Sequence, residues 1–149
     1  MKFDEYLLEI ENFLEDYLNK TRCETYVLGL SGGVDSSLVA GIIRKKLGKE
    51  KLTCIMMPID SHPSDLEDAI KVANALDINY LVIDGSEQFH KSLEQFDKLG
   101  IKLDTMTRSN LKVRIRMTIL YAYAQHRHGL VVGTDNMDER CSGYIHMYR

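Results

Sequence analysis

The segment SGGVDSS, residues 31–37, combines residue types that hold phosphate groups. It follows an apolar run typical of a strand and precedes a helical pattern, so its glycines fall in a strand-to-helix turn. Glycine leaves no Cβ between the backbone amides and a ligand, and the N–H groups at a helix N-terminus attract anions. Because the Asp35 carboxylate would repel phosphate, we expect a bound magnesium ion between them.

Helix capping is the alternative explanation for part of this segment. Asp35 or Ser36 could serve as an N-cap, but a cap requires neither the glycine pair nor the flanking serines. We therefore favour an anion site. The segment lacks the G-x-x-x-x-G-K-[ST] spacing of a Walker A loop and the G-x-G-x-x-G spacing of a dinucleotide loop.

Apolar periodicity along the chain predicts alternating helices and strands. The expected strands are 25–30, 52–57, 80–83 and 129–134, and the expected helices are 3–18, 35–47, 65–76, 86–96 and 107–126. This order predicts an α/β fold, a doubly wound parallel sheet with helices on both faces. Ligands then belong at the carboxyl ends of the strands.

Two further expectations concern the environment of these elements. The helix 107–126 contains MTILYAYA and is expected to be well buried. The segments 58–64 and 97–106 are expected to be mobile loops. We expect residues 1–149 to form a single domain.

Composition narrows the class of protein. The net charge of −3 gives no reason to expect nucleic-acid binding, and no apolar run predicts a membrane span. The N-terminus resembles neither a secretory signal nor a transit peptide. The three cysteines, Cys23, Cys54 and Cys141, lack metal-site spacing and are expected to be reduced thiols of a cytoplasmic protein.

Two motifs carry a family resemblance. SGGVDSS resembles the pyrophosphate-binding loop of the ATP pyrophosphatase superfamily. The stretch 110–144 contains NLKVRIRM and GTDNMDERCSGY, and it is similar to the N-x-K-x-R-x-R-M … G-T-x-N-x-x-E-x-x-x-G-Y signature of ammonia-dependent NAD synthetases. The resemblance covers nearly the whole chain and implies an adenine nucleotide alpha hydrolase-like, Rossmann-like architecture.

The sequence departs from the family pattern Thr-Lys-x-Gly-Asp after Gly143-Tyr144: His146 stands where threonine is expected, Met147 where lysine is and Arg149 where glycine is. We therefore expect an N-terminal fragment or a C-terminally truncated form. Such a chain would lack the last strand and helices of a full synthetase.

The resemblance implies a C–N bond-forming ligase that amidates deamido-NAD with ammonia through an adenylated intermediate. The products would be NAD, AMP and pyrophosphate, and ATP and Mg²⁺ would be required. It also implies a homodimer, with no nucleic-acid or membrane partner. The alternatives are another ATP pyrophosphatase, of the GMP synthetase or tRNA thiolation class, and an ATP-binding module without turnover.

The resemblance also assigns residues, none of them a covalent nucleophile. The pyrophosphate loop would be Ser31, Gly32, Gly33, Asp35, Ser36 and Ser37. The metal carboxylates would be Asp35 and Glu139. Further ATP contacts would be Met57, Arg114 and Thr134, and deamido-NAD would contact Asn110 and, from a neighbouring subunit, Tyr17.

Structural roles are the alternatives for several of these residues. Met57 and Tyr17 could be core residues, Thr134 could end a strand, Asn110 could lie at a helix N-terminus, and Glu139 could be a solvated carboxylate. Arg114 and Arg116 project roughly 200° apart on a helix, so both cannot serve one small site equally. We expect Arg114 to reach ATP and Arg116 to pair elsewhere.

Overall fold

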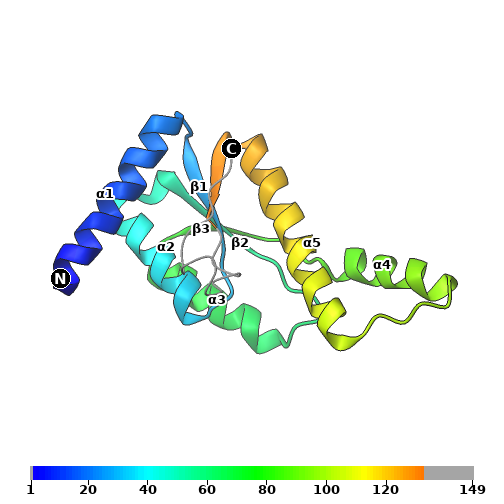
Figure 1. Cartoon of the computed structure of the whole chain (residues 1–149). Helices are drawn as coiled ribbons and strands as arrows, with labels where there is room; N and C mark the ends of the chain where they lie inside the picture. The colour runs from blue at the N-terminus through cyan, green and yellow to red at the C-terminus, as the bar shows by residue number, and fades with distance from the viewer. Residues whose placement is uncertain (1, 133–149) are drawn as a thin grey trace.

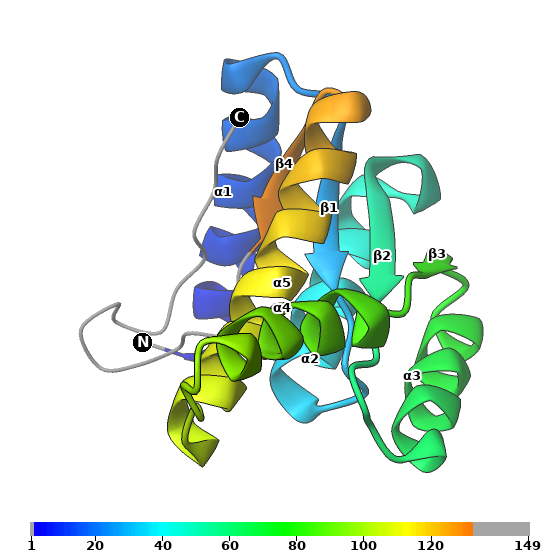
Figure 2. The same cartoon turned by 90° about the vertical axis from the view of Figure 1, so that its right-hand side faces the viewer.

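The computed structural model describes residues 2–132, whose centre is a four-stranded parallel sheet. The strands are β1 (Thr25–Gly29), β2 (Leu52–Met56), β3 (Asn79–Val82) and β4 (Gly129–Val132). They lie in the order β3-β2-β1-β4 (Figure 2). The chain moves outward from β1 through β2 to β3 and then returns to the other side of β1. The strand order therefore reverses between β1 and β4, where open α/β sheets place their ligands.

Helices cover both faces of the sheet (Figure 1). One layer contains α1 (Phe3–Thr21), α2 (Val34–Leu47) and α3 (Pro63–Ala75), and the other contains α4 (Ser86–Lys98) and α5 (Thr105–His126). A short 3₁₀ turn, η1 (Lys49–Lys51), leads into β2. The predicted α/β class, with a parallel sheet between two helical layers, is confirmed.

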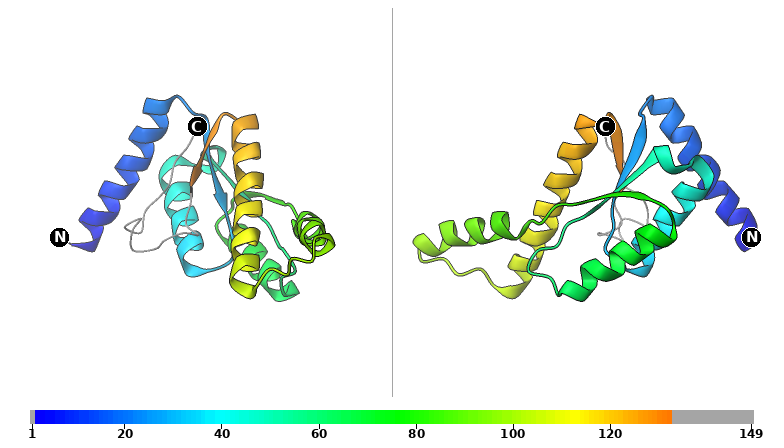
Figure 3. Two further views of the ribbon diagram at one scale, coloured as in Figure 1. Left: turned by 45° about the vertical axis from the view of Figure 1, so that its right-hand side comes forward. Right: turned by 180° about the vertical axis from the view of Figure 1, so that it is seen from behind.

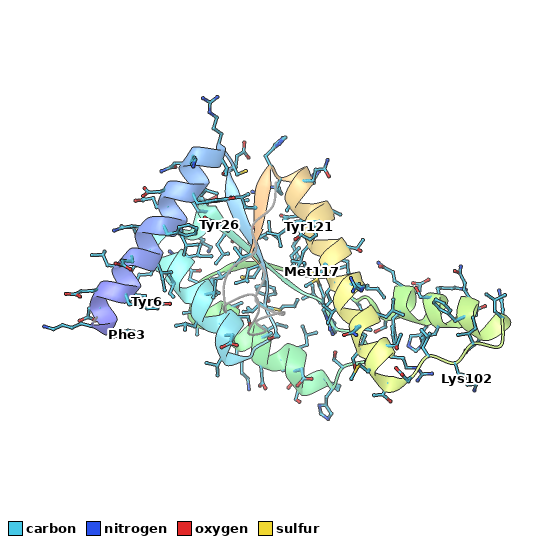
Figure 4. All side chains as sticks on the ribbon, in the orientation of Figure 1. Phe3, Tyr6, Tyr26, Lys102, Met117 and Tyr121 are labelled. Atoms are coloured by element: carbon cyan, nitrogen blue, oxygen red, sulfur yellow. The ribbon has the colours of Figure 1, made fainter. Side chains whose placement is uncertain are left out.

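Alternation along the strands divides the buried residues into two cores. Tyr26 and Leu28 of β1 pack with the α1–α3 layer, whereas Val27 packs with the α5 layer. Tyr26 is fully buried, and its hydroxyl donates to the Leu14 carbonyl of α1 at 2.7 Å (Figure 4). The period of two in the sequence thus directs each strand into both layers.

The expectation that the helix 107–126 is well buried is wrong. In α5, only Ile115, Ile119, Leu120 and Ala124 are buried, while positions on the opposite side, such as Ala122, are exposed. α5 forms an outer layer that contacts β1 and β4 with one face. Small apolar residues such as alanine are also found on solvent-exposed helix faces. The apolar run in the sequence therefore predicts more burial than α5 has.

Two helices, α3 and α5, begin earlier than the sequence predicts, and their capping residues explain why. α3 begins at Pro63, preceded by His62, whose Nδ1 accepts a bond from the Ser64 N–H at 3.1 Å. α5 begins at Thr105, because the Asp104 carboxylate accepts the Thr107 N–H at 2.8 Å. Proline in the first turn and aspartate at the N-cap are both favoured helix starts.

α4 and the segment 99–104 extend away from the sheet (Figure 3). Lys102 lies at the far end of this projection (Figure 4). Among the helices of residues 2–132, none combines the length and apolarity needed to cross a membrane.

Candidate functional site

A pocket of about 380 Å³ opens at the carboxyl ends of β1 and β2. Its walls come from these two strand ends, the loop after β2, the first half of α3, and α5. The lining residues are Gly29, Leu30, Ser31, Met56, Met57, Pro58, Ser61, Asp65, Leu66, Ala69, Val113 and Arg116. The pocket therefore lies at the carboxyl edge of the sheet, as the βα pattern predicts, but on the β1–β2 side and not at the reversal between β1 and β4.

The first glycine of the SGGVDSS turn is required by both backbone and space. Gly32 has φ +84°, the left-handed region that favours glycine. A Cβ built there would lie 3.1 Å from the Ala69 backbone nitrogen and 3.4 Å from the Asp68 Cβ. The turn thus packs directly against α3, and any side chain at this position would push the two apart.

The second glycine caps α2. Gly33 has φ −74° and ψ 166°, and the helix begins at Val34 with no side-chain hydrogen bond to its cap. The capping alternative for Asp35 and Ser36 is therefore wrong, since both lie inside the first turn. The first-turn N–H groups of an α-helix have no intrahelical partner, so α2 presents donors suited to an anion.

The serines of the turn bond to one another. The Ser31 Oγ lies 3.1 Å from the Ser36 Oγ. The Ser31 N–H donates to the Ser36 Oγ at 3.3 Å, and the Gly33 N–H donates to the Ser31 Oγ at 3.2 Å. Ser36 is buried, and its hydroxyl stabilises the turn from the protein interior through its bonds to Ser31.

Ser37 differs from these two serines. Its Oγ is buried and has no hydrogen-bond partner within residues 2–132. A buried hydroxyl without a partner is costly. This unsatisfied group lies in the first turns of α2, and Ser37, unlike Ser31, does not line the pocket.

Arg116 is the arginine at the pocket. It lines the pocket wall, and its Nε donates to the Met57 carbonyl at 2.9 Å. Arg114 is exposed and does not line the pocket. The two side chains diverge as their spacing requires, but Arg116 is the one beside the pocket. An ATP contact by Arg114 stays a prediction.

Several lining residues are not identified by the sequence motifs. Ser61 lies in the β2–α3 loop, defined here as residues 57–62, and Asp65, Leu66 and Ala69 belong to α3. The available signal is position alone, because this loop follows a strand and so begins at the ligand-binding edge of the sheet. Nothing in the residue types singles out Ser61 or Asp65.

The remaining predicted residues do not line the pocket. Asn110 is exposed on α5, four residues before Arg114 and therefore on the same helix face. Tyr17 of α1 is partly buried, packs against the α1–α3 core and has its ring centroid 5.6 Å from that of Phe13. Thr134 and Glu139 lie outside the described residues.

The described part of the chain holds no cluster of three metal-ligating side chains. Asp35 is exposed in the first turn of α2, and the pocket itself contains one acidic and one basic side chain, Asp65 and Arg116. Burial raises the pKa of the Cys54 thiol to about 12, so this cysteine stays protonated and is no nucleophile at neutral pH.

The sequence profile described as NAD synthase matches residues 6–149 of the chain. The chain belongs to this family. The NH(3)-dependent NAD(+) synthetase of Mycoplasma genitalium is 37% identical over 142 residues, which are 94% of this chain and 56% of that protein. The chain thus spans about half the length of the curated synthetases it matches.

Solved structures of NAD synthetases share the fold. The NH3-dependent NAD synthetase of Campylobacter jejuni, in complex with the nitrate ion, matches with a TM-score of 0.84 and 30% identity. The match covers 97% of this chain and 61% of the Campylobacter chain. The glutamine-dependent NAD+ synthetase of Acinetobacter baumannii, in complex with ADP, matches with a TM-score of 0.77 and 26% identity over 86% of this chain and 24% of that chain.

Proposed function

We propose that the chain carries the ATP-binding and adenylating part of an NAD synthetase. The reaction is the amidation of deamido-NAD by ammonia, with ATP converted to AMP and pyrophosphate. The observation that carries this proposal is the SGGVDSS turn. Within a family of NAD synthases, this turn offers helix N–H groups without a side-chain cap, and its Ser31 lines an open pocket at the carboxyl edge of the sheet.

The turn supports a role in holding the leaving pyrophosphate. Negative charge develops on the pyrophosphate oxygens as the bond to the α-phosphorus breaks, and fixed N–H donors stabilise that charge. The helix N-terminus after Gly33 offers such donors. Among the serines of the turn, Ser31 is the candidate donor beside the pocket, because it is exposed and lines the pocket wall; Ser36 and Ser37 stay predicted contacts.

The pocket supports binding of the nucleoside part of ATP. It is mainly apolar, with Met56, Met57 and Leu66 among its walls, and this suits a planar base. Arg116 holds the Met57 carbonyl and supplies a positive charge at the rim of the same pocket. The nicotinate carboxylate of deamido-NAD would attack the α-phosphorus directly, without any protein nucleophile.

One carboxylate of the described residues, that of Asp35, is suited to hold a magnesium ion beside the phosphates. The exposed Asp35 carboxylate lies in the same first turn as the free amides. Mg²⁺ commonly binds one or two carboxylates together with substrate phosphates. Asp35 would therefore hold the ion, with Glu139 as the second predicted carboxylate, and the ion would neutralise charge on the phosphates.

The second substrate, deamido-NAD, is assigned to residues outside the pocket. Asn110 and Arg114 form an exposed polar stripe on α5 that is available to a ligand outside the pocket. We retain Arg114 and Thr134 as predicted nucleotide contacts and Asn110 as a predicted deamido-NAD contact. Tyr17 would contact deamido-NAD bound by the neighbouring subunit of a homodimer. Within its own chain, Tyr17 is partly buried and packs against the α1–α3 core.

The test is pyrophosphate release by the purified chain with ATP, Mg²⁺, ammonium and deamido-NAD, with NAD measured in parallel. We expect release to depend on deamido-NAD. Stimulation by xanthosine monophosphate instead would contradict the proposal and favour the GMP synthetase class. ATP binding without release under any condition would favour a nucleotide-binding module.

A further inference from the structure

The β2–α3 loop is tied to the N-terminal end of α4, on the opposite layer of the sheet. The Gly85 N–H donates to the Pro58 carbonyl at 2.9 Å. The Asp60 N–H donates to the Ser86 Oγ at 2.9 Å. The His90 Nε2 lies 2.8 Å from the Asp60 carboxylate. An ionised carboxylate only accepts, so the imidazole N–H donates. Three groups of α4 and its cap thus hold two residues of this loop, Pro58 and Asp60.

The backbone of Asp60 needs such support. Its φ is +49°, a left-handed conformation that costs most residues free energy and that aspartate tolerates better than most. Both its amide and its carboxylate are bonded to α4. The next residue, Ser61, lines the pocket, and its Oγ accepts the Ile59 N–H at 3.1 Å. The position of Asp60 therefore sets the position of a hydroxyl in the pocket wall.

The α4 end is itself a fixed point. The Asp84 carboxylate accepts the Ser86 N–H at 2.8 Å, and bonding to Ser86 lowers the pKa of Asp84. Phe89 is buried, and the Lys112 ammonium of α5 lies 5.2 Å from its ring centroid. A Cβ at Gly85 would approach the Ile59 side chain to 3.0 Å, so loop and helix are in direct contact.

We propose that His90 and Asp60 are positioning residues for the nucleotide pocket. Their pair holds the β2–α3 loop against α4, and the loop in turn presents Ser61 and Pro58 to the pocket. Neither His90 nor Asp60 lines the pocket. The inference rests on the proposed nucleotide site, and it adds a control of that site from the far helical layer.

Three variants separate the loss of the His90–Asp60 pair from the effect of any substitution on the surface of α4. His90→Ala removes the donor on an exposed helix position, where alanine favours the helix. His90→Gln keeps an N–H donor at similar reach. Gln88→Ala is the matched control, since Gln88 is exposed on the same turn of α4 and bonds no part of the loop through its side chain. A fourth, Asp60→Gly, removes the carboxylate but accepts positive φ.

The first readout is amide hydrogen exchange of the purified full chain without nucleotide. The Ile59 and Asp60 amides are the probes. The Ile59 N–H donates to the Ser61 hydroxyl, and the Asp60 N–H donates to the Ser86 hydroxyl. The pair is 60% and 40% exposed at His90 and Asp60, so we expect exchange to rise about two- to fivefold in His90→Ala. His90→Gln and Gln88→Ala should match the wild type.

The second readout is the Kd for ATP with Mg²⁺, measured by calorimetry. His90→Ala should weaken binding about two- to fivefold, and His90→Gln should restore it. In the Asp60→Gly background, His90→Ala should have no further effect, because the pair is already lost.

Unchanged exchange in His90→Ala overturns the proposal, whatever the nucleotide result. Faster exchange with an unchanged Kd overturns the role in nucleotide binding. A wild-type chain that binds no ATP refutes the proposed function and, with it, the positioning of a nucleotide, whereas the exchange data still decide whether the loop is held by this pair.

Discussion

Replacing Gly32 by alanine should destabilise the protein through two separable effects. The left-handed backbone at φ +84° costs about 1–2 kcal/mol for a residue with a Cβ. The added Cβ would also lie 3.1 Å from the Ala69 backbone nitrogen. Helix backbone cannot move aside as a flexible side chain can, and overpacking of this kind costs about 1–3 kcal/mol. The expected loss in free energy of unfolding is therefore about 2–5 kcal/mol.

Urea unfolding monitored by circular dichroism measures this loss, provided that the m-value stays constant. Gly100→Ala is the control, because Gly100 also has positive φ, at +75°, but a Cβ there meets nothing within 4 Å. It should lose only the backbone part, about 1–2 kcal/mol. If Gly32→Ala is no more destabilising than Gly100→Ala, the turn does not pack on α3 as described.

Three further outcomes can be measured. Arg116→Met should weaken ATP binding about tenfold in calorimetry, because it removes a charged donor from the pocket; a larger loss in Arg114→Met would favour Arg114 as the principal ATP contact. Iodoacetamide at pH 8 should label Cys23, which is partly exposed, and spare Cys54, whose pKa is raised by burial. Site-resolved mass spectrometry of the native protein would reveal labelled Cys54 if this is wrong. The hydrogen bond from the Thr107 N–H lowers the pKa of the Asp104 carboxylate. The stabilising effect of this cap is therefore complete above the ordinary pKa of about 3.9, and it is lost as pH falls through the lower folded value. Asp104→Asn cannot titrate and still caps; unfolding curves should therefore show a smaller loss of stability in acid for this variant, and equal losses would argue against the cap.

The fold follows from local patterns in the sequence. Strands at expected positions alternate residues toward two helical layers, and the switch between period two and period 3.6 is visible without any tertiary information. Helix starts were harder, since His62 before Pro63 is an unusual cap and Gly33 is a cap without a side chain. Those starts depend on geometry that residue type only weakly indicates.

The site was predictable only where residues adjacent in the chain act together. The SGGVDSS turn is one such segment, and its glycine pair proves to serve two different ends: close packing at Gly32 and the start of α2 at Gly33. The choice between Arg114 and Arg116 depends on the rotation of α5 about its own axis. Helical spacing shows that the two diverge but not which of them faces the pocket.

Contacts between segments distant in the chain leave no such trace. Asp60 and His90 are separated by 30 residues, and each is unremarkable in its own segment. Only the packing of the β2–α3 loop against α4 brings them together. The sequence predicts a mobile loop at 58–64 and does not reveal the bonds that join Pro58 and Asp60 to α4; the mobility of the loop stays a prediction.

The order of the strands has a consequence for synthesis on the ribosome. β1 pairs with β4 through Thr25 and Gly129, although β2 emerges first and pairs with the other side of β1. At about 5–20 residues per second, the hundred residues between the two partners take on the order of 5–20 s to translate. Throughout that interval β1 carries an open edge, the kind of strand edge that recruits other chains. A nascent chain of this topology therefore exposes that edge until α5 and β4 have left the exit tunnel.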